Sequence, residues 1–148
     1  MSDIRKGKTP DELAREVKLP PDLAKHPYLQ EWYGAVAWSV RGIYAQQVGW
    51  FDGNPTNIYP LSPAERAKKL LAMSGGKEAF LKAAANSLKD GDFQWSAELV
   101  DYVLAVDSKN TEARNIKAQA LTELGERQQN ATARNYYLTT AQYLLKNP

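Results

Sequence analysis

Side chains that could do chemistry are few in this sequence and scattered along it. Cysteine is absent and His26 is the only histidine. Disulfides, thiol nucleophiles and zinc sites built from cysteine or several histidines are therefore excluded. A Ser-His-Asp triad would have to use His26, yet no nucleophile or acid stands at a recognisable spacing from it. We expect His26 to have a structural or solvent-facing role, and we expect this chain alone to catalyse no reaction.

Oxygen-bearing side chains gather in one short non-helical segment, residues 49–61. Asp52, Asn54 and Asn57 could bind a metal, but their spacing lacks the glycine and the distal glutamate of a calcium loop. Asp-Gly and Asn-Pro pairs are typical of turns, so we expect these side chains to hold a turn through backbone hydrogen bonds. Arg41 lies in an apolar stretch, where it could form a salt bridge, cap a carbonyl or contact an anion.

Large aromatic side chains are the most conspicuous feature of the composition. The 148 residues include four tryptophans, eight tyrosines and three phenylalanines. That is much apolar area for a small chain to bury, either internally or against a partner. Trp50 and Phe51 stand in segment 49–61, where they could form an apolar wall for an alkyl or aryl ligand. Packing in a core or an interface is the alternative.

Charge and hydropathy narrow the function classes. The net charge is +2, from 19 basic and 17 acidic residues, and no basic block is present, so the pattern does not favour nucleic-acid binding. No apolar run is long enough for a transmembrane helix. The first residues lack the apolar region of a signal peptide, and the compartment stays open.

The elements that must position these residues are predicted to be helices, about seven in an all-α fold. Thr9 with Glu12 and Ser62 with Glu65 form capping boxes that predict helices starting there. Between them, an extended or turn segment bounded by prolines 20, 21 and 27 leads to a long helix over 28–48. Steps of three and four place one apolar face on that helix: Leu29, Trp32, Tyr33, Val36, Val40, Ile43 and Tyr44.

An internal repeat with a shift of 34 residues starts at Lys77, pairing Glu78 with Glu112 and Gly91 with Gly125. The period is that of tetratricopeptide repeats, with two antiparallel helices per unit. It predicts helices over 77–89, 94–106, 111–124 and 129–145, with the two glycines in the turns between helices. Residues 1–148 then form one helical domain, divided into 1–25, 26–76 and the two repeats of 77–148.

Two stretches carry a family resemblance. One is residues 26–44, with His-Pro-Tyr-Leu-Gln-Glu-Trp-Tyr-Gly and Ser-Val-Arg-Gly-Ile-Tyr; the other is Gly-Trp-Phe-Asp-Gly-Asn-Pro-Thr-Asn at 49–57. Shorter matches lie at 8–12, 19–21, 61–66, 91–97 and 134–138. Together they resemble the dimerisation domain of the alkylsulfatases, which are alkyl sulfate hydrolases with a zinc-binding catalytic domain of the metallo-β-lactamase type. The resemblance covers nearly the whole chain.

The resemblance implies a homodimer, with subunits paired through intertwined helices. It also implies a parent sulfuric ester hydrolase that cleaves alkyl sulfates with two zinc ions in a catalytic domain missing here. Such parents are often periplasmic or secreted. No cofactor, catalytic residue or metal ligand is expected in this chain, which looks like a domain cut from a longer protein.

Two groups of candidate site residues follow. The predicted dimer interface comprises Leu29, Trp32, Tyr33, Val36, Val40 and Tyr44. The predicted loop at the substrate entrance comprises Trp50, Phe51, Asp52 and Asn54. The alternative function is a monomeric tetratricopeptide-like adaptor that binds peptides in a groove lined by Lys82, Asn86, Lys89, Asn115 and Gln119.

Overall fold

A computed structural model describes residues 7–146, and within that range the chain is helical without a strand. The all-α prediction is confirmed. The chain divides into two compact units: unit 1 holds residues up to Pro60 together with Gln129–Thr132, and unit 2 holds the rest. The helices are α1 (Pro10–Glu16), α2 (Pro21–Ala24), α3 (Val36–Val48), the 3-10 turn η2 (Pro55–Asn57), α4 (Pro63–Met73), α5 (Gly76–Lys89), α6 (Phe93–Val106), α7 (Thr111–Glu126) and α8 (Ala131–Lys146).

Both predicted capping boxes are present and begin their helices where the sequence places them. At α1, the Glu12 N–H donates to Thr9 Oγ1 at 3.2 Å, and the Thr9 N–H donates back to the Glu12 carboxylate at 2.8 Å. Ser62 and Glu65 make the same reciprocal pair at α4. These bonds satisfy backbone N–H groups that a helix start otherwise leaves without partners. They also hold the pKa of both glutamate carboxyls below the ordinary value.

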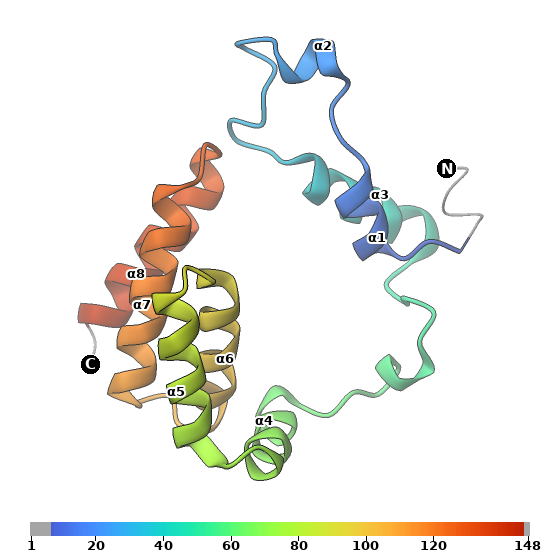
Figure 1. Ribbon diagram of the computed structural model, residues 1–148. Helices are drawn as coiled ribbons and strands as arrows, with labels where there is room; N and C mark the ends of the chain where they lie inside the picture. The colour runs from blue at the N-terminus through green and yellow to red at the C-terminus, as the bar shows by residue number, and fades with distance from the viewer. Residues whose placement is uncertain (1–6, 147–148) are drawn as a thin grey trace. The chain divides into compact units, whose positions relative to one another are not determined.

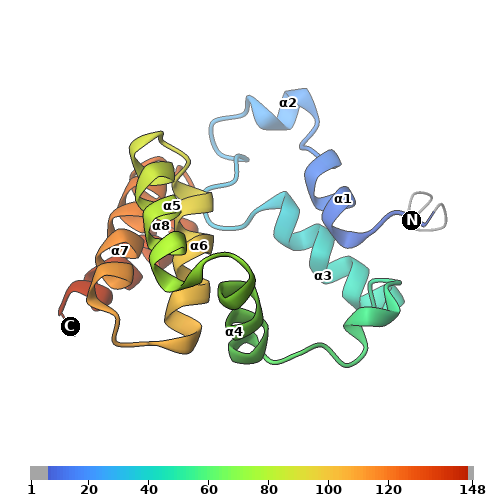
Figure 2. The same cartoon turned by 60° about the horizontal axis from the view of Figure 1, so that its bottom comes forward.

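Unit 2 is a layered helical array with a core of its own. Helices α5, α6 and α7 lie side by side in Figure 1, and Figure 2 shows α4 beside α6. One buried cluster joins α4 to α7 through Leu71, Leu81, Leu99, Val100, Val103 and Ile116. A second cluster, rich in alanine, joins α6, α7 and α8 through Ala97, Ala118, Leu121 and Ala141. Small side chains at these positions let the helix axes approach closely.

The four helices predicted from the repeat are confirmed to within three residues at their ends. Gly91 lies in the turn after α5 with a φ of +81°, a conformation that favours glycine. Gly125 differs from the prediction, because it is buried inside the last turn of α7. A Cβ there would lie 2.8 Å from Leu138 Cδ2, so close helix packing explains this glycine. The tetratricopeptide-like arrangement itself stays a prediction.

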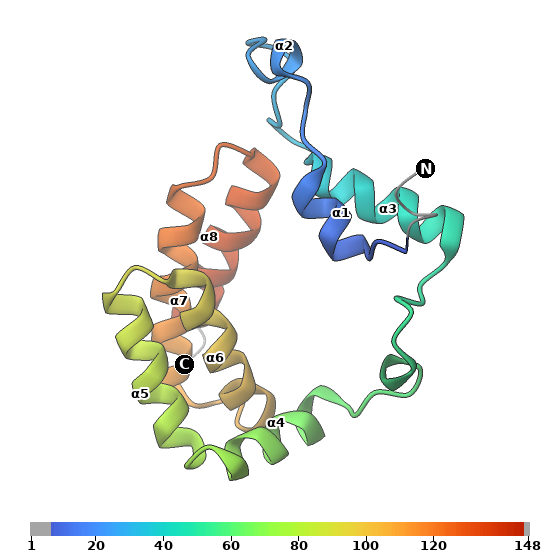
Figure 3. The same cartoon turned by 45° about the vertical axis from the view of Figure 1, so that its right-hand side comes forward.

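Unit 1 is built around two helices, with α1 lying along α3 (Figure 3). Leu13 and Ala14 of α1 are its buried apolar side chains among the described residues. Arg41 on α3 forms an ion pair with Asp11 on α1. The predicted segment 26–76 is divided between the units, because α4 belongs to unit 2.

The predicted helix over 28–48 is confirmed only from Val36 onwards. Residues 27–34 form turns and bends instead. The backbone carbonyls of Glu31, Trp32 and Gly34 accept hydrogen bonds from residues 130 and 131, rather than from N–H groups four residues further along. The segment after Pro20, expected to be extended or a turn, contains the one-turn helix α2.

Candidate functional site

Helix α3 is apolar yet buries none of its thirteen residues. Trp38, Ile43 and Val48 expose 46%, 53% and 48% of their surface. Val36, Val40 and Tyr44, all predicted interface residues, are half-buried. A helix this apolar is normally covered on most of its surface. In unit 1 by itself, α3 therefore presents apolar side chains that nothing covers.

The segment before α3 adds further exposed apolar side chains. Leu29, Trp32 and Tyr33 are 52%, 39% and 75% exposed. Trp32 is anchored at its polar end, because its indole Nε1–H donates to the Pro27 carbonyl at 3.1 Å. The apolar parts of these side chains stay in contact with solvent. The predicted interface residues all belong to unit 1, but the first three lie in a turn and the last three on α3, rather than all on one helix.

Hydrogen bonds from a distant part of the sequence hold this turn. Asn130 is 7% exposed, and its Nδ2 donates to the Glu31 carbonyl at 3.0 Å and to the Gly34 carbonyl at 2.9 Å. The Ala131 N–H donates to the Trp32 carbonyl at 2.7 Å. Sequence reasoning missed Asn130, because the repeat placed it inside a helix predicted over 129–145.

A second set of contacts shapes the start of α3. The Glu31 carboxylate accepts the Val36 N–H at 2.5 Å and so satisfies a backbone donor of the first turn. His26 takes the predicted structural role, since its Nδ1 accepts the Tyr28 N–H at 3.2 Å. Its imidazole ring also lies 5.8 Å from the Tyr28 ring, centroid to centroid.

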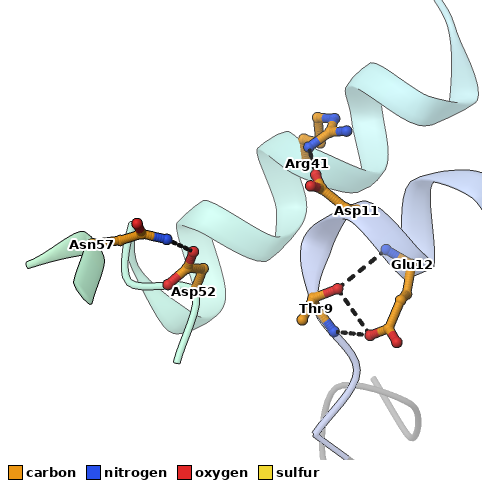
Figure 4. A network of polar contacts seen from close by, with 6 residues as sticks. All are labelled: Thr9, Asp11, Glu12, Arg41, Asp52 and Asn57. Carbon is orange, nitrogen blue, oxygen red and sulfur yellow. Dashed lines mark hydrogen bonds and ion pairs between the residues drawn. The ribbon is translucent and has the colours of Figure 1, made fainter. Parts of the chain in front are cut away.

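Segment 49–61 is a turn held by its own side chains, as predicted. Figure 4 shows Asp52 accepting from the Asn57 side-chain amide, at 2.5 Å. Asp52 also accepts the Asn54 N–H at 2.9 Å, and Asn54 in turn accepts the Thr56 N–H at 3.2 Å. These donors, Asn54 first and Asn57 second, hold the pKa of the Asp52 carboxyl below its ordinary 3.8. Asp52 therefore stays ionised and keeps the turn closed at neutral pH.

Segment 49–61 exposes two large rings, those of Trp50 and Tyr59. Trp50 is 74% exposed, and Phe51, which is half-buried, packs edge-on against it with ring centroids 5.9 Å apart.

Figure 4 also shows the ion pair between Arg41, the one charged side chain of α3, and Asp11. Within residues 7–146, no set of three or more histidine, cysteine or acidic side chains is placed to hold a metal.

Unit 2 has a partly apolar groove beside α6 and α7. A cavity of about 420 Å³ is lined by Leu88, Phe93, Ala118, Gln119, Thr122, Glu123 and Leu145. Of the predicted peptide-groove residues, only Gln119 lines it.

In the described part of the chain, every helix is too short or too polar to cross a bilayer.

Comparison with known proteins gives consistent matches along nearly the whole chain. The alkyl sulfatase dimerisation family model matches residues 9–147. A linear primary-alkylsulfatase of a Pseudomonas strain is 47% identical over 142 residues, which is 95% of this chain and 27% of that protein. An alkyl/aryl-sulfatase of Saccharomyces cerevisiae is 33% identical over 95% of this chain and 22% of its own length.

A solved structure has the same fold. The stereoselective inverting sec-alkylsulfatase Pisa1 from Pseudomonas superposes with a TM-score of 0.91 at 37% identity. The match covers 97% of this chain and 23% of that one. The chain thus spans about a quarter of the length of the proteins it matches.

Proposed function

This chain belongs to the alkyl sulfatase dimerisation family, and we propose that it pairs two subunits of an alkylsulfatase through unit 1. The observation that carries the proposal is α3, an apolar helix without a buried residue. Together with the turn before it, α3 forms the pairing surface, defined here as Leu29, Trp32, Tyr33, Val36, Val40 and Tyr44. Removing exposed apolar area from water is the main driving force for association.

A second copy of the chain is the partner that fits this surface. In a two-fold dimer the same patch is used twice, so one apolar face can cover another. Permanent interfaces of this kind bury about 2,000 Å² or more and are more hydrophobic than transient ones. Unit 1 supports such pairing, since its described residues bury only Leu13 and Ala14 as apolar side chains. The partner supplies the burial that unit 1 lacks.

The turn at 49–61 has a separate proposed role at the entrance to the substrate site of the full enzyme. Trp50 stands 74% exposed on a turn that Asp52 and Asn54 hold in place. A fixed, exposed ring of this kind suits contact with an alkyl chain. In a full-length relative, alanine at the position matching Trp50 should raise KM more for long-chain than for short-chain sulfates. Equal changes in KM would contradict this role.

Sulfate ester hydrolysis itself is assigned to a part of the longer enzyme outside these residues. Zinc would supply an activated water there, but the described residues offer no ligand set for it. We expect this chain, incubated with zinc and dodecyl sulfate, to release no more sulfate than a blank. Release above the blank would refute this assignment.

The competing function is a monomeric adaptor that holds a peptide in the groove of unit 2. The cavity of about 420 Å³ beside Phe93 is the observation in its favour. The two functions differ in the oligomeric state of the free chain and in which unit responds to a ligand.

The deciding experiment is the absolute mass in solution, measured by size exclusion with light scattering over a concentration series. Pairing predicts twice 16.5 kDa, persisting at low micromolar concentration. A mass that stays at 16.5 kDa throughout would refute self-contained pairing and favour the adaptor.

A further inference from the structure

Asn130 holds the turn that precedes α3, although in the sequence it lies 99 residues from Glu31 and 96 residues from Gly34. Its side-chain amide has two N–H donors. Both are directed at backbone carbonyls of the turn, those of Glu31 and Gly34. The neighbouring Ala131 N–H takes the carbonyl of Trp32. Three carbonyls of a four-residue stretch thus have partners in residues 130 and 131.

These bonds decide the conformation of residues 31–34. In a helix the same carbonyls would accept N–H groups four residues ahead, and the apolar spacing of this stretch is helical. Asn130 and Ala131 replace those partners, so the chain turns and α3 begins at Val36. The directions of the Trp32 and Tyr33 side chains follow from this turn, because a helix would instead align each of them with residues three or four positions along.

We propose that Asn130 is a positioning residue for subunit pairing. It touches the backbone of the turn and acts on the partner only through the side chains that the turn presents, Trp32 and Tyr33. The inference rests on the proposed function, since the pairing surface includes both rings. It adds that pairing depends on a polar side chain outside that surface, at the start of α8.

The alternative is that Asn130 has only a local structural role as the cap of helix α8. Aspartate and asparagine are about equally good at the position before a helix, and the aspartate charge suits a helix N-terminus. Aspartate, however, has no N–H to donate and would place a carboxylate against the Glu31 and Gly34 carbonyls. Asn130→Asp therefore separates the two roles, because a cap tolerates it and the positioning contact does not.

The test compares the dimer dissociation constants of Asn130→Asp and the wild-type chain by analytical ultracentrifugation. Asn135→Asp is the matched control: it makes the same chemical change on the same helix, at an exposed position. Gln129→Ala is a second control, because the Gln129 side-chain amide donates to the Gln30 side chain, whereas Asn130 donates to backbone carbonyls of the turn. We expect Asn130→Asp to weaken pairing at least tenfold and both controls to stay within about twofold of wild type.

A milder variant guards against loss of folding. Asn130→Ser keeps one short donor, and we expect it to weaken pairing by an intermediate factor. Amide hydrogen exchange on the same samples should be faster at Ala131 in Asn130→Asp and unchanged across α5 to α7.

The outcomes distinguish the two levels of the proposal. If the wild-type chain dimerises and Asn130→Asp and Asn130→Ser dimerise as tightly as it does, the positioning role is overturned and the proposed function stands. A wild-type chain that is monomeric at all concentrations would overturn both.

Discussion

Truncating Tyr33 to alanine should abolish most of the pairing without disturbing the fold of the monomer. Tyr33 is 75% exposed, so the free chain loses little packing when the ring is removed. The same exposure leaves most of the ring available to a partner. Tyrosine is also among the residue types that carry the most energy at interfaces. This makes Tyr33→Ala the sharpest test of the pairing surface.

The size of the effect follows from the exposed area and the symmetry. A buried aromatic side chain covers about 150 Å² or more, of which three quarters, about 110 Å², is open in the free chain. At about 25 cal/mol per Å², burying this area stabilises the dimer by about 3 kcal/mol. The entropy cost of ordering the side chain reduces this contribution to about 2 kcal/mol. A two-fold interface uses the residue twice, so the variant should lose about 4 kcal/mol. This is roughly a thousandfold in the dissociation constant.

Sedimentation equilibrium over a wide concentration range measures that constant directly. Tyr136→Ala is the matched control, because Tyr136 is 72% exposed but lies on α8, outside the proposed surface. Its dissociation constant should stay within about threefold of wild type. Circular dichroism should show the same helix content in both variants. Equal weakening by the two substitutions, or none by Tyr33→Ala, would refute the assignment of the surface.

Three further outcomes are expected. Gly125→Ala should lower the free energy of unfolding by about 1–3 kcal/mol in urea titrations, because its Cβ would lie 2.8 Å from Leu138 Cδ2. Gly42→Ala on α3 should not lower the free energy of unfolding, because a Cβ there meets nothing within 4 Å. Ser96→Ala should cost about 1 kcal/mol in the same assay, since its fully buried hydroxyl donates to the Ala84 carbonyl at 2.9 Å. The turn at 49–61 should be stable above pH 3.8 and open as pH falls through the lower folded pKa of Asp52, seen as a shift of the Asn54 amide proton by NMR. Asp52→Asn should remove that acid transition, and a transition that persists in this variant would contradict the role of the carboxylate.

Local chemistry made much of the fold predictable from the sequence. The capping boxes at Thr9 and Ser62 involve residues three apart, so their hydrogen bonds form wherever the chain can start a helix. The four helices after Lys77 follow from the internal repeat with a shift of 34 residues, whose period is typical of two antiparallel helices per unit. The Asp52 turn was predictable for the same reason, since its partners lie two and five residues away.

The candidate surface was predictable in its residue types but not in its geometry. Leu29, Trp32 and Tyr33 were expected to extend the face of one long helix with Val36, Val40 and Tyr44. They instead precede the helix, in a turn. The helical spacing of the apolar residues is real, but it carries no information about which backbone carbonyls find partners elsewhere.

The sequence by itself thus determined that the chain is helical and where most helices begin, and it predicted which aromatic side chains form the interface. Tertiary structure decided where α3 starts, and therefore how Trp32 and Tyr33 are presented. The physical reason is the range of the interaction. A capping bond spans three residues and is set by local composition, whereas the Asn130 side chain reaches carbonyls 96 and 99 residues away. Only the folded chain brings those groups within hydrogen-bonding distance.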